Sequence, residues 1–367
     1  MAEPVELQMI EARRIFDLPD DRCFKTHLEL LDTVKDLDGV IVATSVATHC
    51  RVACDCMERG VPIYLEKPIA ESIEPAAKIV QTAKRTGTPV HMGFNCRYAP
   101  WFSGVRDAAL SGVMGKVLSI NWTEGIPATM WSDDYCRSPA YNTRAAIGTL
   151  LLEKACHDID LVNWIVGATC SRVAAFGGRK FFLPRTDVPT HCSTDCPEHQ
   201  TCPFYAPVPQ RRLRLLPEQS NRCVFHTESD LVDRLRSIYE YEDGTVANIN
   251  VEPVWSHPGR FVHICGTAGS LSADSFSNRI SVRDLKTDVE MIHRPTTRTG
   301  GHGGGDPSVI SAFLDMLDDP NNRGLATIED GFETVLLACA ADRAAREHTV
   351  VELGPLRQSA LAGVGAA

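Results

Sequence analysis

A lysine falls where the sequence predicts the end of a buried strand. Segment 62–68 reads as a short strand, and Glu66 and Lys67 come just before the proline that ends it. In an open parallel sheet, ligands bind beyond the carboxyl ends of the strands. A lysine whose pKa is lowered by partial burial can serve there as an acid, a base or an electrostatic stabiliser. The alternative is a solvated lysine ahead of a turn, and Lys67 alone does not decide between the two.

Glu153, His157 and Asp160 form a second group, in the apolar segment 150–167. Spacings of four and three residues predict that all three share one face of a single helix. Buried ionisable groups need a partner or a chemical task. A histidine titrates near neutral pH and suits proton transfer, and the carboxylate one turn earlier can orient it. The alternatives are a metal pair formed by Glu153 and His157, and a histidine that is only part of the core.

Polar residues follow two further predicted strands. Thr44, Ser45 and His49 come after the apolar strand 38–44, and Asn95 and Arg97 come after strand 88–94. Because parallel strands end at the same edge of a sheet, these side chains are candidate contacts to a cofactor or substrate. The alternatives are capping of the next helix by Ser45 or Thr48 and hydrogen bonding at a domain junction by Asn95 and Arg97.

A cysteine-rich loop is the third candidate site. Its soft ligands could hold tetrahedral Zn²⁺, but their spacing is looser than two C-x-x-C pairs, and free thiols or a disulfide are favoured. We therefore expect no metal ion. The cysteines of the loop are Cys192, Cys196, Cys202 and, further on, Cys223.

The glycine-rich segment 300–306 is not a G-x-G-x-x-G turn, and Asp306 in it can cap the following helix.

The order of the elements predicts the domains. Strands and helices alternate up to residue 98, which is typical of a parallel sheet with helices on both faces. Beyond residue 98 several segments alternate apolar and polar residues, which predicts a large open, mainly antiparallel sheet. We therefore expect an α/β protein with a Rossmann-like domain at 1–98, an α/β substrate and oligomerisation domain at 99–355 and a disordered tail at 356–367.

Composition excludes several functions. The 367 residues carry a formal net charge of -10 and no basic stripe, which argues against a nucleic-acid partner. No apolar run is long enough for a transmembrane helix, so we expect no membrane partner. The first residues lack the apolar core of a secretory signal, and a cytoplasmic protein is expected.

Taken in order, the motifs resemble one family. They are Ala43-Thr44 with His49, Glu66-Lys67-Pro68, Gly93-Phe94-Asn95-x-Arg97-Tyr98 and His157-x-x-Asp160. This set resembles the Gfo/Idh/MocA oxidoreductases, named after glucose-fructose oxidoreductase and inositol dehydrogenase. The resemblance implies NAD or NADP as cofactor and hydride transfer to or from a secondary alcohol of a sugar, polyol or related small molecule. It also implies a homo-oligomer, a dimer or tetramer, formed through the open sheet.

The resemblance also implies roles for the residues. Lys67 and His157 would be catalytic, with Glu153 orienting the histidine where many members have aspartate. Lys67, His157, Arg97 and Asp160 would contact the substrate. The nicotinamide side would be lined by Thr44, Ser45, His49, Glu66 and by Asn95 or Arg97.

The start of the sequence departs from the family pattern. The family opens with a strand, a glycine-rich turn that holds the pyrophosphate, a helix and a second strand. This sequence contains no G-x-G-x-x-G and begins at the next helix, so the apolar strand 38–44 is expected to be an unprotected sheet edge. Three explanations remain: a truncated start, a second chain that supplies the missing elements, or an inactive relative acting as a sugar-binding or assembly subunit.

Overall fold

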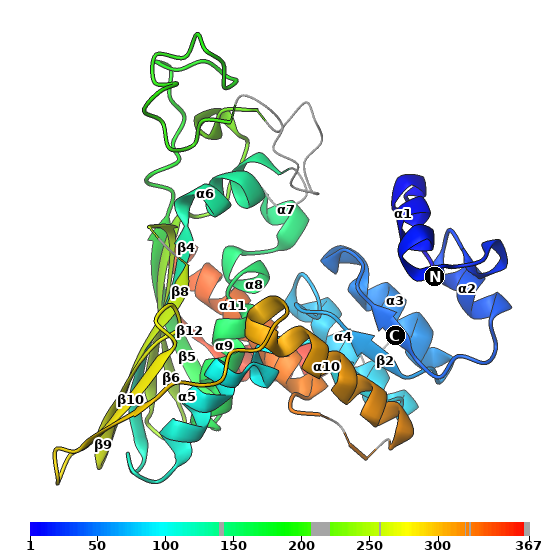
Figure 1. Ribbon diagram of the computed structural model, residues 1–367. Coiled ribbons are helices and arrows are strands. Elements are labelled where there is room, and N and C mark those ends of the chain that lie inside the picture. Colours follow the sequence, from blue (N-terminus) through cyan, green and yellow to red (C-terminus); the bar gives the residue numbers. More distant parts are fainter. Residues whose placement is uncertain (139–142, 207–220, 257, 320, 323, 363–367) are drawn as a thin grey trace.

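The structure, a computed structural model, describes residues 1–138, 143–206, 221–256, 258–319, 321–322 and 324–362. Within these ranges it contains a parallel sheet of three strands and a mixed sheet of nine. Figure 1 shows the large sheet along one side of the molecule, the small sheet towards the N-terminal segment, and helices between the two. The α/β class with a parallel sheet followed by a large open sheet is therefore confirmed.

The small sheet comprises β1 (Val40–Val42), β2 (Ile63–Leu65) and β3 (Val90–Met92), paired in parallel in that order. Helices α3 (Val46–Glu58) and α4 (Ile73–Thr86) connect these strands, and α1 (Glu6–Phe16) and α2 (His27–Thr33) precede them. Strand β1 lies at the sheet edge, and Ile41 is 53% exposed. Among the described residues, the expected apolar edge is therefore present.

The large sheet has the strand order β11-β10-β9-β8-β4-β7-β6-β5-β12. Neighbouring strands run antiparallel except β4 and β7, which are parallel. Along β6, exposed and buried residues alternate, so one face of the sheet packs on helices and the other is open. The strands are β4 (Val117–Pro127), β5 (Cys170–Gly178), β6 (Arg234–Tyr241), β7 (Val246–Trp255), β8 (Gly259–Gly266), β9 (Gly269–Asp274), β10 (Arg279–Asp284), β11 (Glu290–His293) and β12 (Val350–Glu352).

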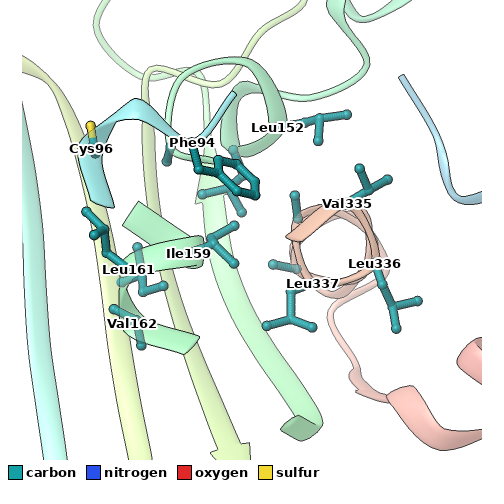
Figure 2. Packing of buried hydrophobic residues seen from close by; sticks show 14 of the residues in the cluster. Phe94, Cys96, Leu152, Ile159, Leu161, Val162, Val335, Leu336 and Leu337 are labelled. Carbon is teal, nitrogen blue, oxygen red and sulfur yellow. The ribbon is translucent and has the colours of Figure 1, made fainter. Parts of the chain in front are cut away.

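The helices between the sheets form the main core. Helix α11 (Ile328–Glu347) packs against α4 on one side and against β5 and α9 (Cys156–Val166) on the other. Figure 2 shows the apolar side chains of α9 and α11 gathered with Phe94 and Leu152, and all of them are buried. This packing fixes α9, which carries His157, relative to the strands of the small sheet. The other helices here are α5 (Pro100–Leu110), α6 (Ala128–Trp131), α7 (Arg144–Ile147), α8 (Leu150–Glu153) and α10 (Gly301–Asp318).

Two sequence predictions are wrong. The single helix expected over 150–167 is divided into α8, which ends at Glu153, and α9, which begins at Cys156. The Lys154 ammonium lies at this break, 3.5 Å from the buried Glu124 carboxylate. The tail expected to be disordered from residue 356 is helical in α12 (Leu353–Ala362). Arg357 of α12 forms an ion pair with Glu333 of α11, which holds the helix against the core, and residues 363–367 lie outside the described ranges.

Candidate active site

A cavity of about 510 Å³ lies between the strand ends of the small sheet and the α8–α9 segment. It brings together Lys67, His157 and Glu153, the three residues expected to be catalytic, with four of the six expected cofactor contacts. Its size is in the range of small-molecule sites. The lining residues are Ala43, Thr44, Ser45, Val46, His49, Glu66, Lys67, Pro68, Met130, Tyr135, Ile147, Glu153, Lys154, His157, Arg260 and His302.

Lys67 follows β2 and reaches across the cavity to α8. Its Nζ donates to the Glu153 carbonyl oxygen at 3.5 Å. Burial acts to lower the pKa of Lys67, but Cys156, Glu153 and Glu66 outweigh it, so the pKa lies above its usual value. The pKa of Lys67 is therefore not lowered, the condition under which the sequence indicates acid or base chemistry for it. The ammonium stays charged at neutral pH and suits proton donation or the stabilisation of negative charge.

His157 also lines the cavity and is 4% exposed. Its ring is 6.1 Å from the Phe94 ring and 5.4 Å from the His302 ring, centroid to centroid. No described residue hydrogen-bonds to either ring nitrogen. Burial, followed by the charge of Lys67, lowers the pKa of His157 well below its usual value. The imidazole is neutral at neutral pH and can accept a proton from a ligand.

The structure does not show the predicted orientation of the His157 ring by the Glu153 carboxylate. Because the helix breaks between these residues, they are not one turn apart on a continuous face. The carboxylate of Glu153 makes no hydrogen bond to the His157 ring. Its charge instead contributes to the raised pKa of Lys67. Glu153 therefore acts electrostatically on the lysine rather than holding the histidine.

Glu66 and His49 brace the strand ends. Glu66 accepts hydrogen bonds from the Tyr64 hydroxyl at 2.9 Å and from the backbone N–H of Lys67 at 3.1 Å. The two ring nitrogens of His49 lie 2.9 Å from the Pro68 carbonyl oxygen and 3.0 Å from that of Thr44. Since both nitrogens face backbone carbonyls, His49 joins the ends of β1 and β2 and has no free nitrogen for a ligand.

Thr44 and Ser45 offer hydroxyls at the start of α3. The Thr44 hydroxyl accepts a hydrogen bond from that of Thr48 at 2.8 Å. Ser45 is the N-cap residue of α3, yet its side chain makes no capping hydrogen bond. The capping alternative does not account for Ser45, and its hydroxyl remains available at a helix N-terminus that favours polar or anionic ligands.

Arg97 and Asp160 do not line the cavity. Their side chains are 3% and 1% exposed, and Arg97 Nε and Nη2 donate to the two Asp160 carboxylate oxygens at 2.9 and 2.6 Å. Arg97 also donates to the Leu325 carbonyl oxygen and to Asp330. The geometry thus gives these residues a structural role, in place of the substrate and cofactor contacts expected from the sequence.

Asn95 also lies outside the cavity lining. Its amide is 2.9 Å from His302 Nδ1 and 2.7 Å from Asp306 Oδ1. It thereby holds the glycine-rich turn, in which His302, Gly303 and Gly304 have positive φ angles. His302, on that turn, does line the cavity. Asn95 consequently positions His302, which lines the cavity, and does not itself line the cavity.

Sequence reasoning missed a charged group in the cavity wall. Lys154 and Arg260 line the cavity, with Glu124 and Asp158 buried behind them. Lys154 could have been noticed beside Glu153. Arg260 gave no signal, because it lies on β8, about a hundred residues along the chain, and only the pairing of β4 with β8 brings it to the site.

The cysteine-rich loop gives no support to a metal site. Cys192, Cys196, Cys202 and Cys223 are free thiols in the structure. In the described part of the chain, no group of three or more His, Cys, Asp or Glu side chains is arranged to hold a metal ion. Nor does any helix in these ranges have the length and apolar composition needed to cross a membrane.

The fold and the cavity define an oxidoreductase of the two-domain Rossmann class. Residues 6–94 match the oxidoreductase family with an NAD-binding Rossmann fold, and residues 131–353 match the C-terminal α/β domain of the same family. The chain therefore belongs to the Gfo/Idh/MocA family, and it is an NAD(P)-dependent dehydrogenase of that type.

Individual relatives are distant. The putative oxidoreductase YteT of Bacillus subtilis is 23% identical over 324 residues, 78% of this chain and 74% of YteT. Inositol 2-dehydrogenase 2 of Saccharopolyspora erythraea is 28% identical, over 41% of this chain and 42% of its own length. Less than half of that dehydrogenase is thus matched, and its substrate does not transfer directly.

Solved structures share the fold at low identity. An oxidoreductase from Agrobacterium radiobacter in complex with NAD+, L-tartaric acid and magnesium has a TM-score of 0.73 at 16% identity, covering 97% of this chain and 90% of that one. A levoglucosan dehydrogenase in complex with NADH and levoglucosan has a TM-score of 0.70 at 19% identity, covering 96% and 89%. These likenesses establish the fold.

Proposed function

We propose that the protein transfers a hydride between NAD(P) and a secondary alcohol of a sugar, polyol or related small molecule. The observation that carries this proposal is the pair of opposite protonation states in one cavity. Lys67 has a raised pKa and His157 a lowered one, so an ammonium and a neutral imidazole line the same cavity. The names of the relatives, inositol and levoglucosan dehydrogenases, favour a polyhydroxylated substrate.

The two groups have complementary roles in alcohol oxidation. The neutral His157 accepts the proton of the reacting hydroxyl, and the Lys67 ammonium stabilises the negative charge that develops on the oxygen. Cys156, Glu153 and Glu66 raise the pKa of Lys67 and so keep it protonated. The dinucleotide, when bound, supplies the hydride acceptor. In the reverse direction, protonated His157 returns the proton to the oxygen of the carbonyl substrate.

Several residues fit the nicotinamide end of the cofactor. Thr44 and Ser45 present hydroxyls at the N-terminus of α3, and Glu66 is held by Tyr64 beside them. They lie at the carboxyl ends of β1 and β2, where open parallel sheets bind ligands. The sequence contains no G-x-G-x-x-G turn, so these residues account for one end of the cofactor only.

Lys67→Met and His157→Asn test the proposal. Turnover of a panel of polyols and sugars with NAD and NADP should fall at least a hundredfold in each variant, while NADH binding measured by fluorescence is retained. Lys116→Met, which removes an exposed lysine, is the matched control and should behave as the parent. Parent-like turnover by Lys67→Met or His157→Asn would refute the assignment. Failure of the parent to bind NADH or NADPH would refute the placement of the nicotinamide in this cavity.

We also propose that the open face of the large sheet forms a homo-oligomer interface. Phe176, Ile238 and Val350 are 70%, 48% and 54% exposed on adjacent strands. Exposed apolar residues grouped in this way mark interaction surfaces. Light scattering after size exclusion should give a dimer or tetramer, and Phe176→Glu/Ile238→Glu should dissociate it. A monomeric parent would exclude the interface.

A further inference from the structure

The wall of the cavity formed by Lys154 and Arg260 has no catalytic role in the proposed function, although the charges of both residues contribute to the lowered pKa of His157. Lys154 follows α8, and Arg260 is the second residue of β8. In the register of β4 with β8, Arg260 lies opposite Glu124. Two cations are therefore placed on the cavity by elements far apart in the chain.

The cations face the cavity and their carboxylate partners lie behind them. The side chains of Lys154 and Arg260 are 18% and 22% exposed, whereas those of Glu124 and Asp158 are 1% and 0% exposed. The wall thus presents positive charge to a ligand, and the negative charge is screened from the cavity by the cations themselves.

Hydrogen-bond donors are left over on this wall. Arg260 Nε and Nη2 donate to the Asp158 oxygens at 3.0 and 3.2 Å, and Nη2 is 2.8 Å from Glu124 Oε1. No described residue accepts from Arg260 Nη1. The ammonium of Lys154 has one partner among the described residues, the same Glu124 oxygen at 3.5 Å. An ammonium carries three donors, so Lys154 can bind a ligand oxygen as well.

The charge of the wall is not fully balanced. Burial raises the pKa of Glu124 to about 7, with Arg260 acting in the opposite direction. Near neutral pH Glu124 is therefore only partly ionised. The two cations of the wall are then opposed by Asp158 and by a Glu124 carboxylate that is only partly ionised, so the wall keeps an excess of positive charge. This excess suits a negatively charged group of a ligand.

We propose that Lys154 and Arg260 bind a carboxylate of the substrate, so that the enzyme acts on sugar acids, such as aldonates or uronates, in preference to neutral sugars. This inference rests on the proposed hydride transfer at the same cavity. Lys154 Nζ and Arg260 Nη1 donate to the carboxylate, while the reacting hydroxyl lies between Lys67 and His157. Hydrogen bonds between charged groups are strong enough to decide specificity.

Matched substrate pairs test the inference. In each pair, glucuronate against glucose and gluconate against glucitol, the carboxylate is the principal difference. The parent enzyme should show a kcat/KM roughly 10- to 100-fold higher for the acid, as expected for one or two charged hydrogen bonds. In Lys154→Met this ratio should fall roughly tenfold or more. Lys154→Arg, which keeps the charge, should retain most of the preference, and the exposed-site control Lys116→Met all of it.

The outcomes separate this inference from the proposed function. Equal kcat/KM for acid and neutral sugars, an unchanged ratio in Lys154→Met, or a preference for sugar phosphates would each overturn the inference while hydride transfer stands. If no sugar of either kind is turned over, the hydride-transfer proposal fails. In that case the binding of glucuronate to the parent and to Lys154→Met, measured by calorimetry, tests whether the wall binds a carboxylate. Weaker binding by the variant supports carboxylate binding at the wall, and equal binding refutes it.

Discussion

Replacing Arg97 by methionine tests whether this residue binds substrate or supports the fold. The guanidinium makes a bidentate ion pair with Asp160, and it also lies 5.1 Å from the centre of the Trp164 ring. Removing it leaves the Asp160 carboxylate buried at 1% exposure without its two donors. Breaking a buried pair from one side costs about 3–5 kcal/mol of the free energy of unfolding.

The ion pair itself is not expected to be strongly stabilising. Burial raises the pKa of Asp160 to about 6 with Arg97 opposing the shift, whereas the carboxylates beside Arg97 together outweigh burial and raise its pKa, so desolvation offsets much of the attraction within the pair. Replacing both partners by apolar side chains removes this penalty. The double variant Arg97→Met/Asp160→Leu should therefore unfold within about 1–2 kcal/mol of the parent, well short of the sum of the two single costs.

Guanidinium chloride unfolding of the parent, both single variants and the double variant measures this coupling. Kinetic assays on the same proteins should show an unchanged KM for substrate wherever the variant is folded. Refutation would take the form of a tenfold rise in KM for Arg97→Met with parent-like stability. In that case Arg97 would contact the substrate, as the sequence alone had indicated.

Three further predictions concern stability. Burial lowers the pKa of His91 to about 4, below the 6.5 of an unperturbed histidine, so the unfolded chain binds a proton in that window that the folded chain does not. The free energy of unfolding should fall as pH falls from 6.5 towards 4, and this residue should account for a loss of about 2 kcal/mol at pH 5. Urea unfolding at pH 7 and pH 5 should show a smaller loss of stability on acidification in His91→Phe than in the parent. An equal loss in the two proteins would contradict the assignment of this effect to His91. Gly305→Ala would place a methyl carbon 2.2 Å from the Asn95 carbonyl oxygen. The free energy of unfolding should fall by about 1–3 kcal/mol, and kcat should also fall. Gly354→Ala, whose added methyl carbon would have no atom within 4 Å, is the neutral control for unfolding. Thr327→Ala removes the capping box of α11 and should cost about 1 kcal/mol in thermal unfolding, and a variant as stable as the parent would show that the cap is dispensable.

The strand ends could be predicted from the sequence. The apolar runs before Thr44, Glu66 and Asn95 each end in polar residues, and the alternation of strands with helices implies a parallel sheet. Parallel strands end at the same edge, so local patterns are enough to bring Thr44 and Lys67 together. The residues alone left open whether His157 is catalytic or part of the core, and the resemblance to the family favoured the catalytic role.

Other features depend on contacts that local spacing does not contain. Glu153 and His157 are four residues apart in a segment with helical periodicity, yet the helix breaks between them, beside the ion pair of Lys154 with Glu124. Arg97 and Asp160 each look like ligand contacts, and only their pairing across 63 positions shows that they neutralise one another.

The sequence by itself determined the family and the α/β class and proposed Lys67 and His157 as a pair, because these follow from motifs and from the periodicity of single elements. The tertiary structure decided which polar residues face the cavity and in which protonation state. Burial and neighbouring charges set a pKa, and both arise from segments that meet only after folding. For that reason the charged wall of Lys154 and Arg260 is visible only in the folded chain.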